Sequence, residues 1–190
     1  MRYVIVDLEA TCWEKGTSRD RMEIIEIGAV LLASNVGPVE SEFATFVRPV
    51  ASPQLSDFCT QLTSIRQEDV DPAEDFRTVF PRFVAWIGDE PFRLCSWGAY
   101  DLDQFRTDCA RHEIPLPASF ENHINLKKAF SRLKDVRPMG MKGALAMTGI
   151  PLEGTHHRGI DDARNIAQLA QIILPQIEAE ERVVGNSQSG

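Results

Sequence analysis

The stretch RYVIVDLEAT, residues 2–11, decides how the rest of the chain is interpreted. Residues 3–6 are apolar and mostly β-branched or aromatic, which predicts a buried strand. Asp7 and Glu9 interrupt this run, and both carboxylates point to one face because side chains alternate across a strand. Two such anions are costly side by side unless a cation lies between them, and Mg²⁺ prefers carboxylate oxygens. The competing interpretation is a strand that simply ends in a polar loop. Acidic residues elsewhere in the sequence must decide between this interpretation and a metal site.

Length and composition are those of one globular domain: 190 residues, 43% hydrophobic and 25% charged. We expect a single domain over residues 1–182 and a flexible tail over 183–190, which is small and polar. No apolar run is long enough to span a membrane, and the run that ends at Asp7 is too short for a signal peptide. The expectation is therefore a cytoplasmic protein without a membrane partner. The four cysteines are scattered, which argues against a zinc site and a disulfide framework.

The charge pattern is ambiguous about a nucleic-acid partner. The net charge of −8 argues against one, because such partners usually leave a basic footprint. A carboxylate metal site, however, adds negative charge that bound cations cancel. Residues 127–142 also hold six lysines and arginines and one aspartate. This segment is either a track for a phosphate backbone or a solvated helix face, and the sequence favours neither.

The order of the expected elements predicts the fold. Strands at 23–32 and 40–47 form a hairpin through the turn at 35–38, and with the first strand they make three antiparallel strands. Strands at 93–97 and 122–126 follow helical crossovers. Helices are expected at the following places: 55–62 with Ser56 as N-cap, Asp71–Pro72 to 87 with a kink or restart at Pro81, 101–113, 126–133, 139–147, and 161–173 with a bend or restart at Pro175. The prediction is an α/β fold whose mixed five-stranded sheet carries helices on both faces.

Three more polar residues occur where strands end or helices begin. Asp101 follows the fourth strand, Asp162 lies in the first turn of the last long helix, and His157 precedes Asp162 on a glycine-flanked loop. Each residue alone has an ordinary explanation: Asp101 as a helix N-cap, Asp162 as a favourable charge at the start of a helix, and His157 as a solvated side chain. We interpret the neighbouring His156 as a solvated side chain. Together, four acids suit two Mg²⁺ or Mn²⁺ ions that clamp a phosphodiester, and a histidine suits deprotonation of water.

These motifs resemble the DEDDh group of the DnaQ-like 3′–5′ exonuclease superfamily, within the ribonuclease H-like fold. The resemblance is closest to the branch that holds the histone-mRNA 3′ exonuclease and the bacterial KapD-type proteins. It covers residues 1 to about 175, and its motifs occur in order: VDLEATCW (6–13), LSDFCTQLTSI (55–65), SWGAYD (96–101), INLK (124–127) and HRGIDD (157–162). One departure is Ser64, where the family usually has glycine.

The resemblance implies a single exonuclease domain that holds two divalent cations, Mg²⁺ or Mn²⁺. It implies that Asp7, Glu9 and Asp162 bind the ion that activates water, and that Asp7 reaches the second ion. Asp101 would act on that second ion through bound water, and His157 would be the general base. The substrates would be single-stranded RNA or DNA 3′ ends, with RNA favoured, and the products nucleoside 5′-monophosphates. Protein partners are left open.

Further residues are candidates for contact with the nucleic acid. The set is Ala10, Thr11, Thr63, Ile65, Trp97, Tyr100 and Lys127. Aromatic side chains beside the motif acids could stack on a base, although core packing explains Trp97 as well. The alternative function is a nuclease-fold binding or regulatory module without turnover, which would have lost an acid or the histidine; this sequence keeps all of them.

Overall fold

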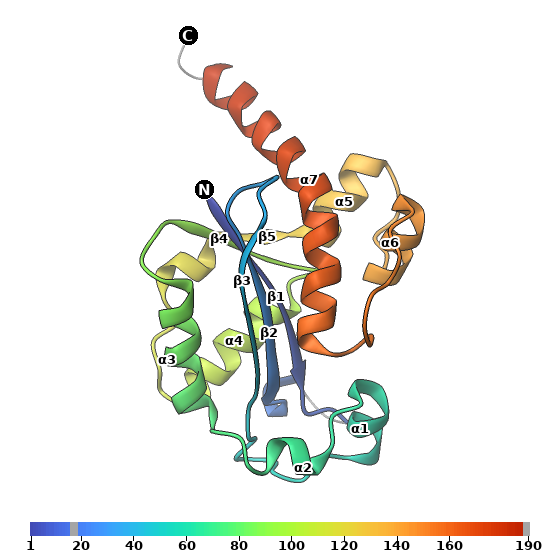
Figure 1. Cartoon of the computed structure of the whole chain (residues 1–190). Helices are drawn as coiled ribbons and strands as arrows, with labels where there is room; N and C mark the ends of the chain where they lie inside the picture. Colours follow the sequence, from blue (N-terminus) through green and yellow to red (C-terminus); the bar gives the residue numbers. More distant parts are fainter. Residues whose placement is uncertain (16–18, 188–190) are drawn as a thin grey trace.

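A five-stranded mixed sheet forms the centre of the molecule (Figure 1). The structure is a computed structural model that describes residues 1–15 and 19–187, with side chains described to residue 184. The strands are β1 (Arg2–Ala10), β2 (Ile24–Leu32), β3 (Val39–Phe46), β4 (Phe92–Ser96) and β5 (His123–Asn125), in the order β3-β2-β1-β4-β5. β1, β2 and β3 are antiparallel neighbours, and β4 and β5 run parallel to β1. The predicted sheet is confirmed.

Helices cover both faces of this sheet, as predicted. They are α1 (Asp57–Thr63), α2 (Gln67–Val70), α3 (Phe76–Ile87), α4 (Tyr100–Arg111), α5 (Leu126–Lys134), α6 (Met141–Thr148) and α7 (Gly159–Ser187), with short 3-10 helices at Arg19–Arg21 and Ala118–Glu121. Apolar residues of α5, α6 and α7 share one buried cluster, and those of α3 and α4 share another.

Side chains alternate between the two faces of the sheet along β1, and this alternation decides on which face its two carboxylates lie. Tyr3 and Ile5 pack into the cluster of α7, whereas Val4 and Val6 pack into that of α3 and α4. Full burial of each such side chain contributes about 1.5–3 kcal/mol, so the register of β1 is strongly determined. Asp7 continues the odd-numbered series and therefore points toward the side that α7 covers.

One predicted helix start is wrong, and a second predicted break, at Pro81, is not a restart. Asp71 and Pro72 do not start a helix, because Asp71 is the C-cap of α2. The start of α3 is set instead by Asp75, whose carboxylate accepts a hydrogen bond from the Thr78 N–H at 3.1 Å. Pro81 lies inside α3 on its exposed side, where water can satisfy the carbonyl that loses its partner, and the helix continues without a restart.

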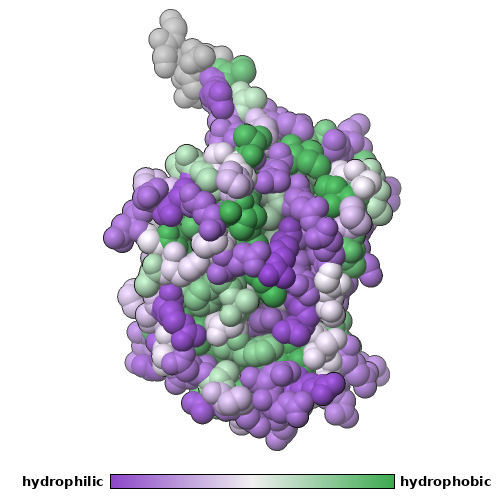
Figure 2. Space-filling view, viewed as in Figure 1, coloured by the Kyte–Doolittle hydropathy of each residue, from purple (hydrophilic) through white to green (hydrophobic). Residues whose placement is uncertain are grey.

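The last helix is longer than the sequence analysis predicted. α7 continues through Pro175 without a restart and is still helical at residues 183–187, where a tail was expected. Val183 and Val184 are exposed there, and residues 188–190 lie outside the described part of the chain. In Figure 2, hydrophilic side chains cover the lower end of the molecule, over α2, and apolar ones reach the surface in small groups beside α7. Within the described residues, no helix is both long and apolar enough to cross a membrane.

Candidate active site

Three of the predicted acids meet at one end of β1. Carboxylate oxygens of Asp7, Glu9 and Asp162 all lie within 4.8 Å of one another. Asp162 reaches the strand because α7 begins directly against β2. A Cβ on Gly28 would lie 1.9 Å from the carbonyl carbon of Gly159, so this close approach requires glycine. The strand pair and the helix start thus bring together acids that are far apart in the sequence.

Asp101 lies beside this group and is held by the backbone of β1. It belongs to the first turn of α4, and its carboxylate accepts a hydrogen bond from the Leu8 N–H at 3.1 Å. Its side chain lines the same cavity as the other three acids. The four acids of the sequence analysis therefore share one site, with Asp101 at its margin.

Mutual repulsion and burial dominate the electrostatics of the site. Burial raises the pKa of Glu9 to about 8, with further increases from the charges of Glu26 and Asp162. The pKa of Asp7 is raised well above its ordinary value by burial and then by Asp101 and Glu9. Burial also raises the pKa of Asp101 to about 6, against the lowering effect of the hydrogen bond from Leu8.

These acids fit a divalent cation. The strongest influences on the pKa of Asp7 and of Glu9 all raise it. The site therefore destabilises the ionised form of the carboxyl groups that it brings together. Closely spaced carboxylate oxygens are the ligands that Mg²⁺ and Mn²⁺ prefer. A bound divalent cation would remove the repulsion and favour the ionised acids.

Two histidines lie on the loop that leads into α7. His157 has a left-handed backbone with φ of 63°, and its N–H donates to a carboxylate oxygen of Asp162 at 3.0 Å. Nδ1 of His156 lies 2.9 Å from the same oxygen, and the two imidazole rings stack with centroids 3.9 Å apart. The pKa of His157 is lowered by burial and then by His156. The expectation that His156 is simply solvated is wrong, because its ring is partly buried against Asp162.

The loop itself is held by a second acid of α7. The Asp161 carboxylate accepts a hydrogen bond from the Thr155 N–H at 2.8 Å. A Cβ on Gly154, whose φ is +72°, would lie 2.4 Å from this carboxylate, so glycine is required at that position. The histidines are therefore fixed at both ends of their loop by α7.

A cavity of about 570 Å³ opens over the acids. Three predicted substrate contacts, Ala10, Trp97 and Tyr100, line it. The Trp97 indole N–H donates to the Met139 carbonyl at 3.1 Å, and its ring lies 5.8 Å from that of Phe130, so Trp97 also serves core packing. A charged wall beside an apolar wall suits a nucleotide, which has a phosphate and a base.

The other predicted contacts do not line this cavity in the described part of the chain. The Thr11 hydroxyl accepts from the Glu23 N–H, and the Thr63 hydroxyl donates to the Cys59 carbonyl at 2.9 Å. Ile65 is fully buried, while Lys127 lies near enough to Asp101 to lower its pKa. The part of these four residues in substrate binding stays a prediction. Ser64, where the family usually has glycine, adopts the left-handed conformation with φ of 62°.

The cavity also includes residues that the sequence analysis did not select. Those with side chains suited to substrate contact are Cys12, Met22, Leu62, Met141, Lys142 and His156. The sequence contained a reason to select Lys142, because it belongs to the basic segment 127–142. It contained none for the apolar residues, since only tertiary packing brings their separate segments to one cavity.

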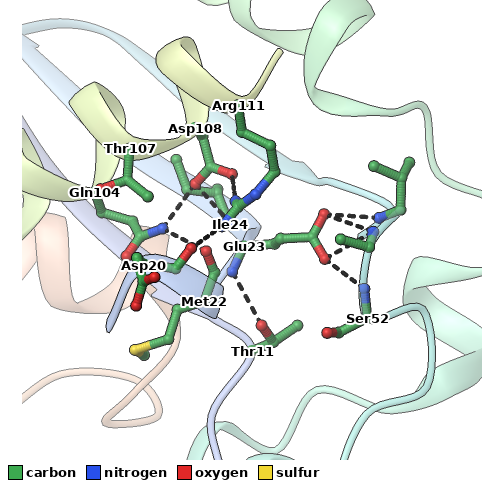
Figure 3. Close-up of polar contacts among 12 residues, drawn as sticks. Thr11, Asp20, Met22, Glu23, Ile24, Ser52, Gln104, Thr107, Asp108 and Arg111 are labelled. Carbon is green, nitrogen blue, oxygen red and sulfur yellow. Dashed lines mark hydrogen bonds and ion pairs between the residues drawn. The ribbon is translucent and has the colours of Figure 1, made fainter. Parts of the chain in front are cut away.

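A buried polar network holds one wall of the cavity in place (Figure 3). The Glu23 carboxylate accepts hydrogen bonds from the N–H groups of Val50, Ala51 and Ser52 at 2.6–3.0 Å. On the other side of Met22, the Gln104 side chain donates to the Met22 carbonyl at 3.0 Å and to Asp108 at 2.7 Å. The backbone around Met22 is therefore fixed from both directions.

Comparisons with known proteins match almost the whole chain. The family model described as exonuclease, of the RNase T group, matches residues 4–170. ERI1 exoribonuclease 2 of Danio rerio is 38% identical over 192 residues, which cover 90% of this chain and 34% of that protein. The 3′-5′ exonuclease Snipper of Drosophila melanogaster is 34% identical over 189 residues, which cover 88% of this chain and 67% of that protein. The chain thus spans about a third of the first relative and two thirds of the second.

A solved structure is similar over almost the whole chain. The nuclease domain of 3′hExo, a DEDDh family member bound to rAMP, superposes with a TM-score of 0.86 at 31% identity. The superposition covers 92% of each chain. This similarity assigns the ribonuclease H-like fold of DEDDh exonucleases to the sheet and helices described above.

Proposed function

Because this chain belongs to the exonuclease family, we propose that it is a metal-dependent 3′–5′ exonuclease that degrades single-stranded RNA in preference to DNA. The products would be nucleoside 5′-monophosphates. The observation that carries this proposal is the group of Asp7, Glu9 and Asp162, whose oxygens lie within 4.8 Å of one another at the floor of an open cavity. Such a group has little structural use without a cation.

The acids divide into ligands and a positioning group. Asp7, Glu9 and Asp162 would hold the divalent cations directly, and Asp101, fixed by the Leu8 N–H, would act from the margin of the site. Two bound Mg²⁺ or Mn²⁺ ions supply charge stabilisation for the attacking and leaving oxygens of a phosphodiester. The side chains themselves set where the phosphate lies.

His157 is the proposed general base. Its lowered pKa keeps the imidazole neutral near pH 7, which is the form that accepts a proton from water. His156 has a different proposed part, because its Nδ1 lies against Asp162 and its ring stacks on His157. We assign it to positioning of the His157 ring and of the Asp162 carboxylate.

The shape of the cavity supports a single-stranded end as the substrate. A volume of about 570 Å³ is within the range of pockets for one small ligand, and a nucleotide in a duplex would have to unstack before it could enter. The names of the relatives and the rAMP of the solved neighbour support a ribonucleotide.

Digestion of matched oligonucleotides tests the proposal. Single-stranded RNA and DNA of one sequence, labelled at the 5′ end, are incubated with the protein in Mg²⁺, in Mn²⁺ and in EDTA. We expect a ladder of products shortened from the 3′ end, faster for RNA, with nucleoside 5′-monophosphates released. EDTA should abolish the ladder, and fresh Mg²⁺ should restore it.

The same assay separates the alternatives. Binding of the labelled RNA without any shortening, in either metal, would indicate a binding module and refute the exonuclease. Internal cuts in place of a ladder would refute the 3′–5′ direction. Equal rates on both oligonucleotides would refute only the preference for RNA.

A further inference from the structure

Cys12 and Cys59 come together at the edge of the active-site cavity, although they are far apart in the sequence. Cys12 follows β1, and Cys59 lies in the first turn of α1. Cys59 is buried in a small cluster with Ile25 and Ile65, and Cys12 packs against the same cluster. We refer to Cys12 and Cys59 as the thiol pair.

The Ser56 hydroxyl bridges the backbones of the two cysteines. The Ser56 hydroxyl, which caps α1, donates to the Cys12 carbonyl at 2.6 Å and accepts from the Cys59 N–H at 3.0 Å. The Cys59 thiol also lies 3.7 Å from the Ala10 carbonyl, to which it can donate a hydrogen bond. The start of α1 is thus attached to the end of β1 at several points, which holds the two cysteines next to each other.

The two thiols differ in access to solvent. Cys12 is partly exposed and lines the cavity, whereas Cys59 is fully buried behind it. The neighbouring Cys12 lowers the pKa of Cys59 to about 7, against the raising effect of burial, whereas Cys59 and burial raise the pKa of Cys12. The pair therefore combines an accessible thiol with a buried one that has the greater thiolate character.

The remaining cysteines provide an internal comparison. Cys95 belongs to the core cluster of α5, α6 and α7, and Cys109 belongs to that of α3 and α4. Both are buried, and burial raises the pKa of each thiol. They lie in separate clusters, so each serves as an unpaired buried cysteine against which the thiol pair can be judged.

We propose that the thiol pair is an oxidation site, at which a peroxide converts Cys12 and Cys59 into a disulfide that lowers the nuclease activity. The effect on activity rests on the proposed function. Hydrogen peroxide oxidises one thiol of the pair to a sulfenic acid and is itself reduced to water. The sulfur of the other cysteine then attacks the sulfenic sulfur, the S–O bond breaks, and a second water leaves with the two remaining protons. One peroxide is reduced, and two thiols lose two electrons.

The disulfide should act on substrate binding through α1. A disulfide bond is about 2.05 Å long, much shorter than a non-bonded contact between sulfurs, so its formation draws α1 toward the end of β1. Cys12 and Leu62, both on the cavity wall, move with it. A misplacement of about 1 Å beside a substrate can cost ~10²-fold in rate. We expect kcat/KM on single-stranded RNA to fall by about 10-fold or more.

The experiment measures the bond and the activity separately. The full chain is treated with hydrogen peroxide, quenched by alkylation and digested with trypsin. The peptides that hold the thiol pair are residues 3–15 and 22–66, because cleavage after Arg48 is blocked by Pro49. We expect these two peptides to be linked, the linked mass to be 2 hydrogens below the sum, and the link and the loss of activity to be reversed together by dithiothreitol.

Two variants serve as controls. Cys59→Ala should keep its own untreated activity after peroxide, whereas Cys109→Ala, which removes a buried cysteine outside the pair, should lose activity like the wild type. Thermal melting checks that both variants are folded. If Cys59→Ala does not fold, Cys12→Ser replaces it. Its activity after peroxide is then compared with the activity of its own untreated sample.

Each result is decisive. Failure to form the 3–15 to 22–66 link while wild-type thiols are being consumed would overturn the oxidation site. A quantitative link without any change in kcat/KM would overturn its effect on activity. A reduced protein that degrades no RNA or DNA would refute the proposed function, and the peptide link would still decide whether the oxidation site exists.

Discussion

Two sets of buried or partly buried carboxylates lie at the same end of the sheet, and they differ in what surrounds them. Glu23 accepts hydrogen bonds from three consecutive backbone N–H groups, beginning at Val50. Glu26, on the strand next to β1, is paired with Arg158 and accepts from the Gly159 N–H at 2.9 Å. Asp7 and Glu9 instead face each other and Asp162, and their pKa values are raised.

The difference separates acids that hold the fold from acids that need a ligand. Buried charge is tolerated when donors compensate the lost hydration, as at Glu23 and Glu26. The carboxylates of Asp7 and Glu9 gain no such compensation from one another. A sheet position alone does not distinguish the two classes, because Glu9 and Glu26 are direct partners in the register of β1 and β2.

The sharpest test of this comparison exchanges one acid of each class for its amide. Asp7→Asn should lower nuclease activity by about 10³-fold or more, because charge stabilisation by bound metal is worth several kcal/mol. The variant should remain folded, with a metal-free melting temperature equal to or above that of the wild type, because repulsion is relieved. Glu23→Gln, the matched control, should melt at a lower temperature and keep most of its activity when folded. Circular dichroism that showed Asp7→Asn unfolded would make Asp7 a structural acid.

The two histidines allow a finer distinction within the ligand-dependent class. His157→Ala should cut turnover by ~10²–10⁴-fold, the usual contribution of a general base, while RNA still binds. The wild-type rate should rise with pH through a group below the ordinary histidine value of ~6.5, because burial lowers the pKa of His157 and only the neutral form accepts a proton. This rise should flatten in the variant.

His156→Ala is the matched control for that measurement. It should leave the rise with pH in place and have the smaller effect on turnover, because His156 contacts Asp162 and serves positioning. A larger loss in His156→Ala than in His157→Ala would reverse the assignment of the general base. The pH–rate profiles of the three proteins decide between the two residues.

Metal-free stability should depend on pH in a direction set by Glu9. The pKa of Glu9 is about 8 in the folded protein, against ~4.3 in an unfolded chain. Between these values the folded state binds more protons, so the free energy of unfolding falls as pH rises through this window. In EDTA the melting temperature should drop by ~3 °C or more between pH 5.5 and pH 8.5, since about 1 kcal/mol shifts it by ~2–4 °C.

Glu9→Gln and added Mg²⁺ test the cause of that drop. The variant has no carboxyl to titrate at this position, so its melting temperature should fall less over the same range. Mg²⁺ should also reduce the drop, because it binds the ionised carboxylates and favours them at high pH. An equal drop in wild type and variant would assign the pH dependence to other groups.

The smallest expected effect concerns the basic segment beside the site. Replacing Lys127 and Lys128 together with alanine should weaken RNA binding and reduce the log–log salt slope by at most roughly two. Arg77→Ala with Arg82→Ala, on α3, is the control and should leave the slope unchanged. Filter binding at several salt concentrations measures it. An unchanged slope in the lysine variant would make the segment a solvated helix face.

Local signals in the sequence were enough to predict the architecture and the carboxylate group. The apolar run before Asp7 and the alternation of β1 predicted a central strand that presents two acids on one face. The Ser56 cap and the turn at 35–38 were also readable, because capping and turn formation depend on neighbouring residues. Boundaries near prolines were not, since a proline ring on the exposed side of a helix is compatible with its continuation, as at Pro81.

Sequence alone therefore predicted the mixed five-stranded sheet, the four acids and the histidine loop, because each depends on periodicity or on a motif within a few residues. Only the tertiary structure decided which groups meet across distant segments. It placed His156 on Asp162, brought Cys12 into the cluster of Cys59, and gave Glu23 donors that Asp7 lacks among the described residues. Such contacts depend on how helices pack against the sheet, and no local pattern records which of two similar acids the packing will leave without a partner.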